Sequence, residues 1–154
     1  MERTISIKWF FTHPPEYVWE CLTNPELISI WLMKNNFKPV LGHRFNFYAK
    51  PIPSMDFDGI VYCEVIDIVP LKKLVYTWKG GPSPGIIKLD TVLVWTLESK
   101  NEGTEVLLEH KGFKGFHNYI ASMFMGSGWK NGITKAFEKV LNQYAQDVER
   151  EKHD

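Results

Sequence analysis

Residues 129–148, WKNGITKAFEKVLNQYAQDV, have the clearest periodicity in the chain. Their apolar side chains recur at spacings of three, four and one, at Trp129, Ile133, Ala136, Phe137, Val140, Leu141, Tyr144 and Val148. Such spacing is typical of an amphipathic helix of about five turns with a broad apolar stripe. We therefore predict one long C-terminal helix that begins at Trp129, buries this stripe and frays over residues 149–154.

The chain before this helix shows the period of two that is typical of strands. Residues 89–98, for example, place Leu89, Thr91, Leu93, Trp95 and Leu97 on one face. We predict strands at 4–11, 42–48, 58–69, 74–78, 89–98 and 104–111. The connections between the later strands are too short for parallel crossovers, so the pairing should be antiparallel. Two short helices, with prolines in their first turns, should follow the first strand, and Thr12 or His13 should lie near the cap of the first one.

This order predicts an α+β helix-grip fold: a curved antiparallel sheet of about six to seven strands around one long C-terminal helix. One helix cannot cover a flat sheet of that size, so the sheet should bend around it and leave space that side chains do not fill. We expect a single domain over residues 1–154, which is a usual length for one domain. The stretch 112–128 should hold a separate short helix near the mouth of that space, with Ser127 helping to start the terminal helix.

Composition excludes several classes of protein. The 154 residues carry 18 basic and 18 acidic side chains, which is not the basic excess of a nucleic-acid binder. No apolar run approaches the ~20 residues that span a bilayer, and residues 1–5 lack the layout of a signal peptide. Cys21 and Cys63 cannot build a disulfide framework and should be reduced and buried. We expect a cytoplasmic monomer or weak homodimer with no stable membrane insertion.

Several short motifs in this order resemble the activator-of-heat-shock-ATPase homologue family of the START-like superfamily, also called SRPBCC or birch-pollen-allergen-like. They are residues 15–19, 22–27, 31, 64–70, 73–78, 95–98, 103–110, 112–113 and 128–129. Together they span nearly the whole chain, and the resemblance implies a cavity between sheet and helix. Cys63 stands where glycine is usual, and Trp31 is single where two adjacent tryptophans are common, so the shape of the pocket should differ.

The expected cavity wall combines aromatic, aliphatic and polar side chains. Its apolar members are Trp31, Phe45, Phe47, Trp78, Leu93, Trp95, Phe113, Phe124, Trp129, Ile133 and Phe137. Aromatics suit an ordinary core equally well. His110 shares a strand face with Val106 and Leu108, and Asp67 and Tyr76 could add polar points. For His110, three interpretations stay open: a core histidine bonded to a neighbouring hydroxyl or carbonyl, a ligand anchor, or a proton shuttle. Asp67 could equally be solvated.

Standard catalytic and metal-binding patterns are missing, so we predict no metal and no cofactor. The Gly80–Gly85 stretch lacks the Lys-Ser/Thr of a phosphate loop and should be a hairpin loop. Our first hypothesis is non-enzymatic binding of a small hydrophobic or aromatic ligand, such as a lipid, polyketide or flavonoid-like compound. The alternatives are a co-chaperone-like module that contacts the ninety-kilodalton heat-shock chaperone, implied by the resemblance alone, and a cyclase or dehydratase that uses His110.

Overall fold

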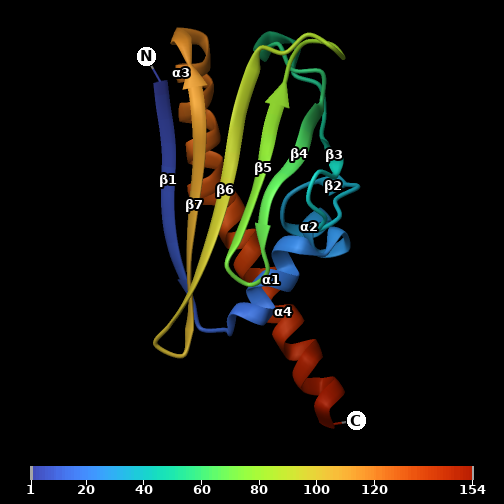
Figure 1. The fold of residues 1–154 in the computed structure, drawn as a ribbon, viewed down its shortest axis with the longest axis vertical. Coiled ribbons are helices and arrows are strands. Elements are labelled where there is room, and N and C mark those ends of the chain that lie inside the picture. Colours follow the sequence, from blue (N-terminus) through green and yellow to red (C-terminus); the bar gives the residue numbers. More distant parts are fainter. Residues whose placement is uncertain (1, 154) are drawn as a thin grey trace.

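Seven strands form one antiparallel sheet in the computed structural model, which describes residues 2–153 apart from the side chains of Phe116, Tyr119, Ile120 and Phe124. Across the sheet the order is β1-β7-β6-β5-β4-β3-β2, so the first strand pairs with the last (Figure 1). The strands are β1 (Glu2–Phe11), β2 (Lys34–Asn35), β3 (Arg44–Tyr48), β4 (Ile60–Val69), β5 (Lys73–Gly80), β6 (Leu89–Lys100) and β7 (Gly103–Lys114). The predicted helix-grip fold is confirmed. β2 was not predicted, because two residues are too short to show alternation.

Two short helices follow β1 as predicted: α1 (Pro15–Thr23) and α2 (Pro25–Trp31). The residue at the start of α1 is Pro14, and neither Thr12 nor His13 caps the helix. Asn24 separates the two helices, because its backbone N–H donates to the Glu20 carbonyl while its side chain accepts from the Glu26 N–H at 2.9 Å. A side-chain acceptor at this position satisfies a backbone donor that the first turn leaves free.

The C-terminal third is one continuous helical segment. It consists of α3 (Gly115–Ser127), a π-helical turn (Gly128–Ile133) and α4 (Thr134–His153). The predicted break before Trp129 is wrong, because Ser127 has helical backbone angles and caps nothing. The π-helical turn keeps the chain helical between α3 and α4. The predicted fraying also does not occur in the described range, since α4 reaches His153 and projects past the sheet (Figure 1).

The inward faces of the strands and α4 enclose one core. Leu74, Tyr76 and Trp78 of β5 lie on the same buried face as Leu93 and Trp95 of β6. From α4 the core receives Phe137, Val140, Leu141 and Ala145. Full burial of each large apolar side chain stabilises the fold by about 1.5–3 kcal/mol. The stripe from which the helix was predicted therefore faces this core, and α1 and α2 cover part of it.

Asp67 does not face this core. The β4–β5 register shifts between Val65 and Asp67, so Asp67 pairs with Val75 on the outer face, while Ile68 takes the position opposite the buried Leu74. The Asp67 carboxylate lies 3.3 Å from the Lys73 ammonium, and both side chains are about half exposed. The sequence left two positions open for Asp67, one beside Tyr76 at the cavity and one in solvent. A β-bulge, which the alternation does not reveal, moves it to solvent.

Two loops meet at one end of the sheet. The β3–β4 loop contains a 3-10 turn (Pro53–Met55), and the Asp58 N–H at its end donates to the Gly81 carbonyl of the β5–β6 loop at 2.8 Å. Gly81 is required there, because a Cβ atom would overlap the Ile86 carbonyl oxygen. The predicted hairpin loop after β5 is thus confirmed. No helix in the described residues is long and apolar enough to cross a membrane.

Candidate functional site

The space between the sheet and α4 is filled by aromatic side chains. Trp31 packs edge-on against Trp95 and Phe137, with ring centroids 5.8 and 5.0 Å apart, and Trp95 packs against Trp129 at 5.8 Å. The gap left among these rings measures only 10 Å³. A cavity of that size holds at most one water molecule. The expectation of vacant space beside α4 is therefore wrong, because large rings from α2, β6 and the helix interdigitate there.

A pocket of about 250 Å³ lies further along the sheet, between α3 and the two joined loops. We call it the α3 pocket. Its apolar wall consists of Met33, Ala49, Ile52, Met55, Phe57, Val61, Trp78, Leu89, Ala121 and Met125, with backbone from Gly80 and Gly81. Its polar border consists of Asp56, Lys79, Lys88, His117 and Asn118. A mostly apolar hollow with a few polar groups is the usual composition of a small-molecule site.

Two polar contacts link the first turn of α3 to the loops. The Asn118 side-chain amide donates to the Lys88 carbonyl at 2.9 Å, which joins α3 to the start of β6. His117 Nε2 lies 3.9 Å from the Asp56 carboxylate of the β3–β4 loop. These contacts lie at the polar border of the α3 pocket, and they hold α3 across it.

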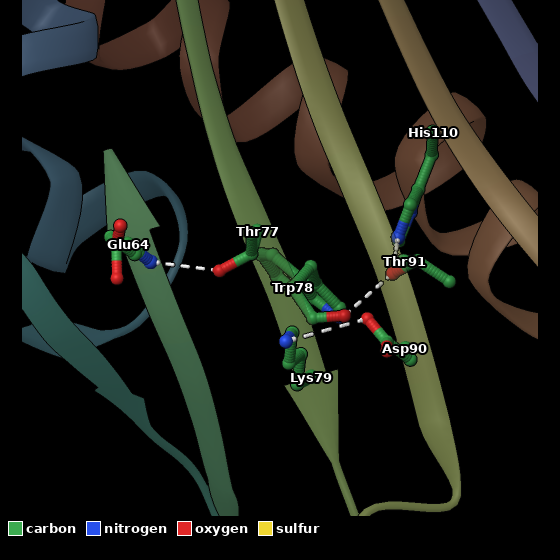
Figure 2. A network of polar contacts seen from close by, with 7 residues as sticks. All are labelled: Glu64, Thr77, Trp78, Lys79, Asp90, Thr91 and His110. Atoms are coloured by element: carbon green, nitrogen blue, oxygen red, sulfur yellow. Dashed lines mark hydrogen bonds and ion pairs between the residues drawn. The ribbon is translucent and has the colours of Figure 1, made fainter. Parts of the chain in front are cut away.

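Behind the pocket, His110 is fully buried in a chain of hydrogen bonds (Figure 2). The Trp129 indole N–H donates to His110 Nδ1 at 3.2 Å, and His110 Nε2 lies 2.7 Å from the Thr91 hydroxyl. Because Nδ1 accepts, the ring proton belongs on Nε2 and points at Thr91. The Thr91 hydroxyl in turn donates to the Trp78 carbonyl at 2.7 Å. The chain ties the π-helical turn to β7, β6 and β5.

This environment makes His110 a neutral core residue. Burial lowers its pKa from 6.5 to about 3, so the imidazole stays uncharged near neutral pH. Both ring nitrogens already have protein partners, which agrees with the first of the three interpretations of this residue. The fixed tautomer makes His110 a structural link between strands and helix.

The other polar candidates do not join His110. The Tyr76 hydroxyl accepts from the Trp95 indole N–H at 3.1 Å, and burial raises its pKa. Asp67 lies on the outer face of the sheet. In the described part of the chain, no hydrogen bond or ion pair connects any two of His110, Tyr76 and Asp67. These three side chains therefore do not form one convergent polar cluster.

Both cysteines are free and buried, as predicted. Burial raises the pKa of Cys21 to about 12 and that of Cys63 further. A thiol with such a pKa is protonated and unreactive at neutral pH.

Of the predicted wall residues, Trp78 borders the α3 pocket. Most of the others lie within the packed core: Trp31, Phe45, Phe47, Tyr76, Leu93, Trp95, His110, Phe113, Trp129 and Phe137. Ile133 is half-buried against that core, and the side chain of Phe124 lies outside the described residues. The contact of these side chains with a ligand stays a prediction.

Sequence reasoning missed the loop half of the pocket. Ile52, Met55 and Phe57 lie between β3 and β4, where no periodicity marks an inward face. The available signal was a set of large apolar side chains among prolines, in a loop that would otherwise be polar. The stretch 112–128 was expected to lie near the mouth of the cavity, and Met125 of this stretch lines the α3 pocket.

Comparisons with known proteins agree with this architecture. Residues 12–142 match the family model described as "Activator of Hsp90 ATPase homolog 1-like protein". The crystal structure of protein MLL2253 from Mesorhizobium loti shares 37% identity, covering 92% of this chain and 98% of that one, with a TM-score of 0.79.

More distant structures share the fold. Bacillus halodurans protein BH1534 is 23% identical, with a TM-score of 0.71 over 90% of this chain and 96% of that one. CalU16 from Micromonospora echinospora is 18% identical, with a TM-score of 0.68 over 99% of this chain and 90% of that one. No protein of curated function matched the chain.

Proposed function

Because this chain belongs to the activator of Hsp90 ATPase homolog 1-like family and has the helix-grip fold, we propose that it binds a small apolar ligand in the α3 pocket. The observation that carries the proposal is the contrast within one interior. Next to α4 only 10 Å³ is left open, whereas 250 Å³ stays open beneath α3. Protein interiors are close-packed, so a hollow of this size in one place needs a reason.

The size and chemistry of the pocket define the ligand class. Its 250 Å³ lies just below the range of drug-sized sites, which begins at about 300 Å³. A compound of one or two rings, or a medium alkyl chain, is the matching size. Met33, Met55 and Met125 surround the space, and flexible thioether side chains adapt to ligands of different shapes. Burial of the ligand's apolar surface, worth about 25 cal/mol per Å², supplies the driving force.

Thermal unfolding with 2-ethylnaphthalene and decanoate as probes tests the proposal. A ligand at a hundred times its Kd stabilises the folded state by about 2.7 kcal/mol. For a chain of this size that corresponds to a rise in Tm of about 5–10 °C.

A matched pair of variants locates the binding. Met125→Trp fills the pocket from α3 and should abolish the rise in Tm. Met123→Trp adds the same ring to the same helix at a side chain that is 51% exposed and does not line the pocket, so it should leave the rise intact. If both variants respond to the probes as the wild-type protein does, the α3 pocket is not the site. If no probe shifts the Tm of the wild-type protein, the proposal is wrong.

A further inference from the structure

Indole N–H groups inside this protein are almost all paired. Four tryptophans are at least nine-tenths buried: Trp31, Trp78, Trp95 and Trp129. Three of them donate to a partner: Trp31 to the Cys21 carbonyl at 2.8 Å, Trp95 to the Tyr76 hydroxyl at 3.1 Å, and Trp129 to His110 Nδ1 at 3.2 Å. This is the usual behaviour of a buried tryptophan.

Trp78 is the exception. Its side chain is 4% exposed, and its N–H donates to no group in the described residues. Among those residues, every fully buried side-chain nitrogen or oxygen has a hydrogen-bond partner. The Trp78 nitrogen is therefore not fully buried. Trp78 lies on the inner face of β5 and is one of the residues that line the α3 pocket.

The ring that carries this donor is held in place. Phe47 and Trp129 pack against it with centroid distances of 5.3 and 5.7 Å, and His110 packs edge-on at 5.5 Å. The Trp78 carbonyl is fixed as well, by the Thr91 hydroxyl. A donor on a rigid ring loses little conformational entropy when a ligand binds to it.

We infer that the ligand of the α3 pocket carries a hydrogen-bond acceptor oxygen, such as that of a ketone, ester or quinone, which accepts from the Trp78 indole N–H. This inference rests on the proposed function and adds the polar group by which the ligand is oriented. The apolar wall of the pocket includes Val61, Leu89 and Met125, whereas its described polar side chains include the exposed His117 and Asp56. An acceptor-free hydrocarbon of the same shape would leave the N–H dry and unpaired, which is unfavourable in an apolar site.

The test compares 2-acetylnaphthalene with 2-ethylnaphthalene, which has nearly the same shape but no acceptor. Isothermal titration should show the ketone binding about two- to tenfold more tightly, the range that one neutral hydrogen bond supplies. In ¹⁵N-resolved NMR spectra, the ketone should shift the Trp78 indole N–H resonance downfield, and the hydrocarbon should not.

Two variants remove the donor. Trp78→Phe keeps an aromatic ring, and replacement of Trp78 by β-(3-benzothienyl)alanine keeps the full bicyclic shape. The second variant makes the test independent of whether the fold tolerates phenylalanine at this position. In both, the ketone should lose its advantage while 2-ethylnaphthalene binds as before. Trp31→Phe, away from the pocket, should keep the preference for the ketone.

The results separate the two proposals. Equal affinity of the two probes for the wild-type protein, with no change on substitution of Trp78, would overturn the acceptor inference and leave the pocket as a site for any apolar compound. Binding of neither probe would overturn the proposed function itself.

Discussion

The two halves of the helical segment cover the same sheet but leave different interiors. Along α4, Phe137 and the rings it meets leave 10 Å³, whereas 250 Å³ stays open along α3, where the described lining residues are His117, Asn118, Ala121 and Met125. The sheet contributes Trp78 and Trp95, from neighbouring strands, to the two regions. Among the described residues, the packed region thus receives the large ring of Phe137 from α4, and the open region receives Ala121 and Met125 as its apolar side chains from α3.

The comparison also separates stability from binding. The packed half holds the aromatic cluster and the His110 hydrogen bonds, while the hollow half is closed by polar contacts at exposed side chains such as Asn118 and His117. Regions with fewer buried contacts open more easily, and binding sites are drawn from them. Substitutions in the packed half should therefore affect mainly stability, and substitutions in the hollow half mainly ligand binding.

The largest expected effect is on the packed half. Phe137→Ala should lower the free energy of unfolding by about 3–5 kcal/mol, because it opens a cavity in a filled core. Met125→Ala, at the wall of a space that is already open, should cost only about 1 kcal/mol. Urea denaturation of both variants checks this. Equal losses would erase the difference between the halves.

The second-largest effect should be the loss of stability in acid, which arises from His110 in the packed half. The pKa of His110 is about 3 in the folded protein and 6.5 as the ordinary value, so between these values the unfolded chain binds a proton that the folded one does not. Stability is therefore full above pH 6.5 and falls below it by about 1.4 kcal/mol per pH unit, or about 3 kcal/mol at pH 4.5. His110→Gln should lack this component. Parallel slopes of stability against pH in both proteins would contradict a neutral, buried His110.

A smaller loss is expected at Thr91. Thr91→Val leaves His110 Nε2 and the Trp78 carbonyl without their shared partner and should cost about 1–3 kcal/mol. Thr77→Val, on the neighbouring strand, removes an acceptor for the Glu64 N–H at a half-buried position (Figure 2). We expect this control to lose less in urea denaturation. A greater loss at Thr77 than at Thr91 would show that the His110 chain of hydrogen bonds does not carry the stability assigned to it.

The smallest effect should come from Asp67. Asp67→Asn breaks an exposed ion pair with Lys73, and such pairs contribute about 0–1 kcal/mol. Both the Tm and the affinity for 2-ethylnaphthalene should stay within error of the wild-type values. A clear loss of affinity would place Asp67 near the ligand after all.

The sequence predicted the sheet and helices better than the pocket, for identifiable reasons. Strand alternation and the stripe from Trp129 to Val148 report which face is buried, and those faces are buried as predicted. Periodicity does not report the volume of side chains relative to the space between sheet and helix. It could not show that Trp31, Trp129 and Phe137 would fill the space they were expected to line. It also could not decide between the cavity and solvent for Asp67, because one extra residue in β4 reverses the faces that follow.

Strand alternation and helical periodicity could not predict which loop residues line the pocket. Ile52 and Met55 enter the pocket wall because a hydrogen bond between Asp58 and Gly81 joins two loops distant in sequence. The continuity of α3 and α4 was hidden for a different reason. The apolar stripe begins only at Trp129, and Ser127 was interpreted as the start of a separate helix, whereas the π-helical turn joins α3 to α4.

Methyl NMR of ¹³C-methionine-labelled protein, titrated with 2-ethylnaphthalene, tests the central claim most directly. Met33, Met55 and Met125 line the α3 pocket, while Met123 is exposed on the same helix and does not line it. The methyl signals of the first three should shift together and saturate with one Kd, and that of Met123 should stay in place. Unchanged signals from the three pocket methionines, at probe concentrations that stabilise the protein, would show that the ligand binds elsewhere.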